Sequence, residues 1–249
     1  MRIFVAGATG YTGTALVAEA LARGHTVTAH VRPGSPGGDA AAARFAAAGA
    51  TVSRAPWDPA AITEALADAR PTAVFALLGT TRARGAAAAR DGRTETYATV
   101  DRDLTLLLHA AAATLALPPV FVYLSSMGAD RPGANAYLQA RAAVEQGLAQ
   151  SPLPQVIARP SFITGPDRAE PRPAERWGAA VADVALGAVG AFGARAFADR
   201  YRSIRAAELA RGLLRAAAAA EGSAGGRVVL DSAGLRDNAA QSSHSNLSS

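Results

Sequence analysis

Short runs of apolar residues alternate with longer, alanine-rich segments of helix-forming residues over most of the chain. Short apolar runs bounded by Gly, Pro or Ser are typical of buried strands. They predict strands at Ile3–Ala6, Thr26–Val31, Thr51–Arg54, Ala73–Leu78, Val120–Leu124, Gln155–Arg159 and Arg227–Leu230. The segments between them predict helices at Thr12–Arg23, Ala40–Ala48, Ile62–Ala69, Thr94–Leu117 and Asn135–Gln150, and near residues 174–190 and 204–220.

Strands that alternate with helices indicate βαβ units, and therefore an α/β fold with a doubly wound parallel sheet of the Rossmann type. In a chain of 249 residues we expect one such domain over residues 1–235. Residues 162–220 are expected to form a small C-terminal helical region on the substrate side, with a loop at 166–176, and residues 236–249 a disordered tail. Ligands of such sheets bind beyond the carboxyl ends of the strands, so the residues there are candidates for chemistry.

Three glycines with the spacing GxxGxxG follow the first predicted strand and open the first predicted helix. Gly7 permits a tight turn, Gly10 lets backbone amides approach a pyrophosphate, and Gly13 lets the helix pack closely. The helix N-terminus then faces the phosphate charge, which favours dinucleotide binding over a purely structural turn. The residues expected to contact the dinucleotide are Gly7, Thr9, Gly10, Tyr11, Thr12 and Gly13.

The residue that ends the second strand indicates which dinucleotide binds. NAD-binding proteins usually place an acid there for the ribose hydroxyls, whereas an Arg suits a 2′-phosphate. Arg32 stands at this place, and no acid follows until Asp39. We therefore expect NADP(H) to be preferred and NAD(H) to be possible, because a guanidinium can hold a phosphate through two hydrogen bonds. The alternative is that Arg32 is an ordinary solvated residue.

Further strand ends supply other candidate cofactor contacts. Asp58 stands where such folds often contact the adenine, although a helix cap ahead of Pro59 explains it equally well. After the fourth strand, small residues either line the cofactor without bulk or form a plain loop. The remaining expected cofactor contacts are Leu78, Gly79, Thr80, Thr81, Arg141 and Pro160.

A pair of serines ends the fifth strand, and the next helix carries a tyrosine and an arginine. Tyr137 lies 11 residues after Ser126, and Arg141 follows Tyr137 at i+4, on the same helix face. A phenol beside a cation can donate a proton to a carbonyl that a serine hydroxyl polarises. We expect Tyr137, Ser126 and Arg141 to be catalytic, although Tyr137 alone could be a packing residue.

Composition excludes several kinds of site. The absence of Cys excludes disulfides, thiolate metal sites and thiol nucleophiles, and fits a cytoplasmic location. All 25 basic residues are Arg, with a net charge of +5 and a pI of 10.3. They are interleaved with acids, so we expect no nucleic-acid groove. The four histidines show no ligand spacing, so we expect no metal.

Two more segments have plain interpretations. Glu95, Asp101 and Asp103 lack a nearby histidine and are interpreted as solvated helix charges rather than metal ligands. The apolar stretch Trp177–Ala194 is interrupted by Asp183 and is rich in Gly and Ala, so we expect no membrane span.

Several motifs together resemble the Tat-interacting-protein branch of the atypical short-chain dehydrogenases, which is related to the NAD-dependent epimerases and NmrA-like proteins. The motifs are the glycine loop, Leu78–Arg82, Val100–Asp103, Leu124–Asp130, Tyr137–Gln139, Arg159-Pro160 and Gly165-Pro166. The resemblance implies an NAD(P)-binding Rossmann domain with NADPH preference, in which Tyr137 is the catalytic candidate and Ser126, rather than Ser125, has the serine role. Where the family has Lys, this chain has Arg141, which keeps the charge but not the geometry.

We therefore expect an NADPH-dependent oxidoreductase that reduces a carbonyl or an activated double bond of a small molecule, as a monomer or homodimer. The alternative is a non-catalytic NADP(H)-binding regulator or sensor. The intact Ser126 and Tyr137 favour the enzyme, and the replacement of Lys by Arg141 favours the alternative slightly.

Overall fold

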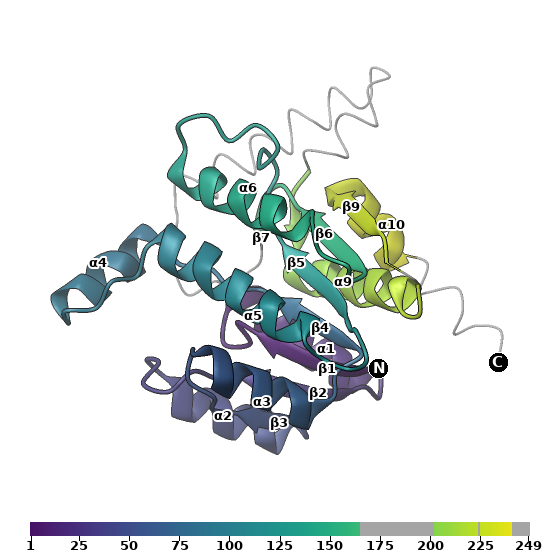
Figure 1. Cartoon of the computed structure of the whole chain (residues 1–249), viewed down its shortest axis with the longest axis horizontal. Helices are drawn as coiled ribbons and strands as arrows, with labels where there is room; N and C mark the ends of the chain where they lie inside the picture. Colours follow the sequence, from purple (N-terminus) through teal and green to yellow (C-terminus); the bar gives the residue numbers. More distant parts are fainter. Residues whose placement is uncertain (165–201, 224, 241–249) are drawn as a thin grey trace.

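The computed structural model describes residues 1–164, 202–223 and 225–240. Within them, a parallel sheet of seven strands has the order β3-β2-β1-β4-β5-β6-β9 (Figure 1). The strands are β1 (Arg2–Ala6), β2 (Thr26–His30), β3 (Thr51–Ser53), β4 (Ala73–Ala76), β5 (Val120–Leu124), β6 (Gln155–Arg159) and β9 (Arg227–Asp231). A small second sheet pairs β7 (Ile163–Thr164) with β8 (Ile204–Arg205).

Helices cover both faces of the large sheet. One face packs against α1, α2 and α9, and the other against α3, α5 and α6. The expected α/β fold of the Rossmann type is thus confirmed. The helices are α1 (Tyr11–Ala22), α2 (Gly38–Ala47), α3 (Pro59–Ala69), α4 (Arg82–Arg90), the π-helix η1 (Tyr97–Asp103), α5 (Leu104–Ala113), α6 (Ala136–Leu148), α9 (Ala206–Ala220) and α10 (Ser232–Ala240).

The central strands β1, β4 and β5 are apolar over most of their length because both faces of the sheet are buried. In β1, Ile3 and Val5 enter the core under α1 and α9, while Phe4 and Ala6 enter the core under α3 and α5. The apolar runs in the sequence locate these strands for this reason.

The strand order reverses between β1 and β4, and in folds of this kind the ligand crevice lies at the carboxyl ends of the strands at such a reversal. Gly7 follows β1 directly and has a φ of +83°. A Cβ at this position would lie 2.5 Å from the carbonyl oxygen of Leu77, which follows β4. The glycine therefore lets the two strand ends approach each other at the base of the crevice.

The structure differs from the sequence predictions between β4 and β5. The single helix expected at Thr94–Leu117 is divided into η1 and α5, and α4 was not expected at all. A reciprocal cap between Thr96 and Thr99 starts η1 with a backbone hydrogen-bond pattern that apolar periodicity does not predict.

The expected tail from residue 236 is wrong over its first residues, because α10 continues to Ala240. Leu235 and Ala239 are buried in this helix, which packs against α9. A Cβ at Gly212 of α9 would lie 2.3 Å from the Leu235 carbonyl oxygen, so a glycine permits this close packing. The loop expected at 166–176, the helix near 174–190 and the rest of the tail lie outside the described residues.

Gly7→Ala is expected to lower the free energy of unfolding by about 3 kcal/mol or more, because it adds a collision with Leu77 to the strain of a positive φ. The matched control is Gly24→Ala, where φ is +73° and no heavy atom lies within 4 Å of the new Cβ, so about 1 kcal/mol is expected. Urea denaturation measures both losses. Equal losses would show that the contact with Leu77 places no constraint on the fold.

Candidate functional site

The glycine loop leaves the N-terminus of α1 without a side-chain cap. Gly10 is the N-cap residue and offers no side chain to the first turn of the helix. Asp58, Thr81 and Asn135 cap α3, α4 and α6 with side-chain oxygens, whereas α2 and α9 also begin without a side-chain cap. An uncapped N-terminus above a turn between β1 and α1 is a favourable place for a phosphate group.

The three glycines of the loop are required for different structural reasons. A Cβ at Gly13 would lie 2.1 Å from the Gly7 carbonyl oxygen, so Gly13, like Gly7, is needed for the loop to pack. Gly10 has an ordinary φ of −74°, and a Cβ there would lie 3.2 Å from the same oxygen. Gly10 is thus the least constrained by the loop itself, and its lack of a side chain keeps the approach to the helix N-terminus open.

The other predicted residues of the loop are placed differently. Thr9 is exposed at the turn, and Thr12 is buried in the first turn of α1. The Tyr11 hydroxyl donates a 3.3 Å hydrogen bond to the Thr164 carbonyl, which connects the loop to β7. Asp58 accepts a 2.9 Å hydrogen bond from the Ala61 N–H, so the helix-cap alternative is confirmed and its contact with an adenine stays a prediction.

Arg32, which follows β2, forms an ion pair with Glu95, a residue that lies before η1. The guanidinium Nη2 and the Glu95 Oε1 are 2.5 Å apart, and Arg93 meets the same oxygen at 2.8 Å. Burial raises the pKa of Glu95, but the two guanidinium groups outweigh this effect and hold the pKa below its usual range. Glu95 is therefore not the solvated helix charge expected from the sequence, since its side chain is only 11% exposed.

A buried ion pair joins α6 to η1 at the carboxyl ends of β4 and β5. Arg141 Nη2 lies 2.9 Å from Asp101 Oδ1, and the two residues are 5% and 0% exposed. The expectation that Asp101 is a solvated charge is wrong, because the π-helical backbone of η1 places this residue inside the fold. Asp101 Oδ2 also accepts a 2.9 Å hydrogen bond from the Thr80 N–H.

The other donors of Arg141 are directed at the strand ends. Nη1 donates to the Leu124 carbonyl at 2.8 Å and to the Tyr123 hydroxyl at 3.3 Å, and Nη2 donates to the Leu78 carbonyl at 3.2 Å. Burial works against the charged guanidinium, but the neighbouring Tyr137, Tyr123 and Asp101 together raise the pKa of Arg141. Burial raises the pKa of Asp101, while Arg141 and the Thr80 N–H act against that rise.

Tyr137 lies on this ion pair. The Arg141 guanidinium carbon is 5.0 Å from the centre of the Tyr137 ring, a cation–π arrangement, and the Tyr97 ring meets Tyr137 edge-on at 5.4 Å. Burial raises the pKa of the second phenol on Arg141, Tyr123, to about 12. Tyr137 is only half-buried, so it is the phenol that a ligand in the crevice can reach.

The two serines after β5 differ in their surroundings. Ser125 is buried and donates a 2.6 Å hydrogen bond to Glu145. Ser126 is half-buried and makes a long hydrogen bond of 3.4 Å to the Met127 carbonyl. Ser126 thus has the more accessible hydroxyl, and its role toward a substrate stays a prediction. Pro160 is buried, and its carbonyl holds the Met127 N–H at 3.0 Å.

Glu145 was not singled out by the sequence analysis, yet it connects three elements. Its carboxylate accepts hydrogen bonds from Ser125, from Arg159 at 2.6 and 3.0 Å, and from Arg227 at 2.9 Å. Glu145 belongs to α6, Arg159 to β6 and Arg227 to β9. The ion cluster therefore attaches the edge strand to the helix that carries Tyr137.

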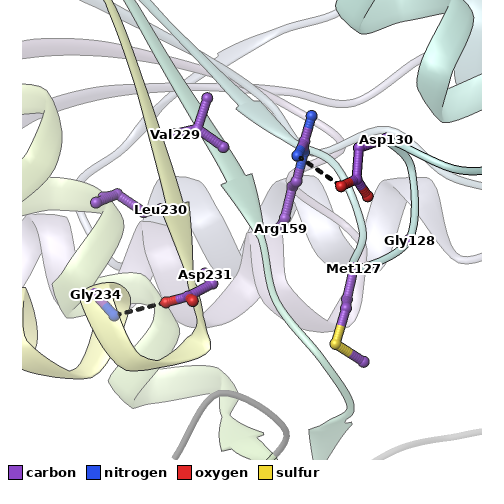
Figure 2. A pocket seen from close by; sticks show the side chains of 8 residues that line it. All are labelled: Met127, Gly128, Asp130, Arg159, Val229, Leu230, Asp231 and Gly234. Carbon is purple, nitrogen blue, oxygen red and sulfur yellow. Dashed lines mark hydrogen bonds and ion pairs between the residues drawn. The ribbon is translucent and has the colours of Figure 1, made fainter. Parts of the chain in front are cut away.

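A pocket of about 270 Å³ lies beside this cluster, and its lining includes Met127, the residue that follows Ser126. Figure 2 shows Arg159 and Asp130 paired on one side, and Asp231 directed at the Gly234 N–H on the other. The residues that line it are Met127, Gly128, Asp130, Arg159, Val229, Leu230, Asp231 and Gly234. Its place at the carboxyl ends of β6 and β9 makes it the candidate pocket for a small molecule.

The residues present fit a dinucleotide in the crevice. Three buried polar atoms at the carboxyl ends of β4 and β5 have no hydrogen-bond partner: Thr80 Oγ1, Asp101 Oδ1 and Arg141 Nε. Asp101 Oδ1 meets Arg141 as an ion pair without the alignment of a hydrogen bond. These three atoms are buried inside the fold, so the observation that fits a dinucleotide is the N-terminus of α1, which lacks a side-chain cap and can bind a phosphate group.

The strand order, the glycine loop and the crevice define a nucleotide-binding protein of the Rossmann type. Residues 7–200 match the family model described as NAD(P)H-binding, and the chain belongs to this NAD(P)H-binding family. The expected relationship to short-chain-dehydrogenase-type Rossmann proteins is confirmed, whereas the Tat-interacting-protein branch stays a prediction.

Three known proteins show the extent of the similarity. Protein fmp52, mitochondrial, from Emericella nidulans is 38% identical over 121 residues, which are 48% of this chain and 47% of that protein, so the chain spans about half the length of this relative. A candidate epimerase from Burkholderia cenocepacia J2315 has a TM-score of 0.64 at 26% identity, over 92% of this chain and 75% of its own. A candidate NAD-dependent epimerase/dehydratase from Bacillus halodurans has a TM-score of 0.64 at 18% identity, over 95% and 99% of the two chains.

Within the described ranges, none of the helices is long and apolar enough to cross a membrane.

Arg141→Met is expected to lower the free energy of unfolding by about 3 kcal/mol at neutral pH, because it leaves the Asp101 carboxylate buried without a countercharge. The variant raises the pKa of Asp101 in the folded state further above its unfolded value. The contribution of Asp101 to stability is therefore retained below the unfolded pKa of Asp, about 3.9, and is lost as the pH rises above it toward the raised pKa of the folded state. Chemical denaturation across this range measures the slope.

The control for this prediction adds Asp101→Asn to Arg141→Met, which removes both charges and keeps an acceptor for the Thr80 N–H. We expect the double variant to recover at least half of the loss and to show no pH slope from this site. A double variant as unstable as Arg141→Met alone would contradict the assignment of the loss to an unpaired charge.

Proposed function

We propose that this protein is an NADP(H)-dependent oxidoreductase that reduces a carbonyl or an activated double bond of a small molecule. The observation that carries the proposal is the position of Tyr137 on Arg141, at the carboxyl ends of β4 and β5 and beside the dinucleotide crevice. The half-buried Ser126 follows β5 at the same edge of the sheet. A proton donor and a hydrogen-bond donor thus lie at the edge where the crevice opens.

Each residue of the site has a role in this proposal. A bound nicotinamide would supply the hydride. The N-terminus of α1 holds the pyrophosphate, and Arg32 holds the 2′-phosphate. Tyr137 donates a proton to the substrate oxygen, and the Ser126 hydroxyl polarises the same oxygen. The pocket beyond Ser126 receives the rest of the substrate.

Arg141 is a positioning residue in this proposal. The family's Lys would hold the cofactor ribose through a single ammonium, whereas four of the Arg141 contacts are made to Asp101, Leu124, Leu78 and Tyr123. Tyr137 therefore lies on an ion pair with no net charge rather than on a free cation. The guanidinium fixes the ring in place, and the phenol carries out the proton transfer.

The NAD(P)H-binding family model supports the use of a dinucleotide, and the structural neighbour from Burkholderia cenocepacia, at 26% identity, is named as an epimerase, which supports an enzymatic role. The NADP(H) preference, a cytoplasmic location and a monomeric or homodimeric state are parts of the same proposal. They rest on Arg32, on the absence of Cys and on the resemblance of the motifs.

A second candidate function is a non-catalytic NADP(H)-binding regulator or sensor. The contacts of Arg141 favour this function. Both terminal nitrogens of its guanidinium already bind Asp101 or the carbonyls at the strand ends, so few donors remain to hold a nicotinamide ribose. The two functions share the same binding crevice and differ only in whether Tyr137 takes part in turnover.

Tyr137→Phe separates these two functions. We expect NADPH oxidation with a panel of ketones, quinones and aldehydes to fall about 100-fold, because the variant lacks only the proton-donating hydroxyl. The NADPH dissociation constant is expected to change less than about twofold, since the ring still lies on Arg141. Full activity in Tyr137→Phe would remove Tyr137 from the mechanism, and no turnover in the unaltered protein would favour the regulator.

Gly10→Val is expected to abolish dinucleotide binding and to leave the fold intact. The ordinary φ of Gly10 accepts a side chain, but a branched one covers the approach to the N-terminus of α1. Calorimetric titration with NADPH and thermal unfolding measure the two properties. A folded Gly10→Val protein that binds NADPH with unchanged affinity would show that the loop has only a structural role.

A further inference from the structure

An acid stands beside Arg32 although none follows it closely in the sequence. Ordinarily the carboxylate that binds the ribose hydroxyls of NAD comes from the end of β2 itself. Here the end of β2 carries Arg32, and a carboxylate reaches it from Glu95, which is 63 residues away in the chain. The adenosine end of the crevice therefore holds both of the groups that proteins use to distinguish NADP from NAD.

The position of Glu95 is fixed by its surroundings. Its carboxylate is bound by Arg32 at 2.5 Å and by Arg93 at 2.8 Å. Its backbone carbonyl packs against α4, where a Cβ at Gly85 would lie 2.7 Å from that oxygen. Arg32 remains 35% exposed and can accept a ligand on its open side, while Glu95 is 11% exposed.

The two ligands differ at one group, and the ion pair responds to each in an opposite way. A 2′-phosphate carries nearly two negative charges, so it is attracted by Arg32 and repelled by Glu95. A 2′-hydroxyl is neutral, so it can donate a hydrogen bond to Glu95 and accept one from Arg32. Glu95 thus opposes NADP(H) and favours NAD(H), whereas Arg32 favours NADP(H).

We propose that Arg32 and Glu95 together bind the adenosine ribose, and that Glu95 is the residue that lets this crevice accept NAD(H) as well as NADP(H). This inference rests on the proposed function, in which Arg32 holds the 2′-phosphate. Glu95 sets the ratio of the affinities for NADP(H) and NAD(H), and removal of its charge makes the site more selective for NADP(H).

The experiment is a calorimetric titration of the full chain and of Glu95→Gln with NADPH and NADH. Glu95→Gln keeps the size and one acceptor oxygen of the side chain and removes its charge. We expect NADPH to bind about 5-fold tighter, because Arg32 loses its competing carboxylate, and NADH to bind about 3-fold weaker, because a charge-assisted hydrogen bond becomes a neutral one. A purely structural role would move both affinities in the same direction.

Two further variants calibrate the result. Asp91→Asn removes a neighbouring carboxylate that lies 3.0 Å from Arg93 and is 65% exposed, so both affinities are expected to stay within about twofold. Arg32→Ala is expected to weaken NADPH about 10-fold or more and NADH only slightly. Titrations with 2′,5′-ADP and ADP repeat the comparison on the adenosine end alone.

The outcomes distinguish this inference from the proposed function. Opposite shifts in Glu95→Gln, with small effects in Asp91→Asn, support it. Parallel or absent shifts in Glu95→Gln, while Arg32→Ala still weakens NADPH selectively, contradict the role of Glu95 and leave the proposed function standing. Failure of the unaltered protein to bind either dinucleotide contradicts both.

Discussion

The buried ion pair of Arg141 and Asp101 joins the segments that form the centre of the site. Neither charge could be buried alone without a cost of several kcal/mol, so α6 and η1 must reach the sheet together. Arg141 also donates hydrogen bonds from Nη1 to the carbonyl of Leu124, the last residue of β5, and from Nη2 to the carbonyl of Leu78, just after β4. The place of Tyr137 follows, because its ring lies on the guanidinium that these contacts hold.

This constraint also explains the irregular backbone of η1. A regular helix through Thr94–Leu117 would advance Asp101 by a different angle, whereas the wider π-helical turn brings it under Thr80 and Arg141. The Thr105 hydroxyl bonds the Asp101 carbonyl at 2.8 Å and helps to satisfy the altered backbone. The π-helical backbone of η1 therefore helps to place the Asp101 carboxylate at the ends of β4 and β5.

Most strands could be predicted from the sequence, because strands buried on both faces, such as β1, β4 and β5, are uninterrupted apolar runs. The glycine loop was likewise visible, since its spacing reflects local geometry. Asp101 and Glu95 could not be assigned, because their partners Arg141 and Arg32 are distant in the chain and the residues look like ordinary helix charges. The helix α4 carries Arg, Ala and Gly with little apolar periodicity, so nothing in its pattern predicted it.

The two edges of the crevice differ in how they are held. At the glycine loop, backbone contacts at Gly7 and Gly13 leave no room for a side chain, whereas Arg32 and Glu95 are held together by their charges. The packing of the loop does not depend on salt. The partly exposed ion pair weakens as the ionic strength rises.

The attachment of β9 has a consequence for the pocket that it lines. Val228 and Val229 are 47% and 45% exposed, so this strand buries little apolar surface and depends on its backbone ladder with β6 and on the contact of Arg227 with Glu145. Segments with few buried apolar contacts open locally at a lower free energy than the core. The wall formed by Val229 and Leu230 can therefore adjust to ligands of different width while the dinucleotide crevice, four strands away at β1, keeps its shape.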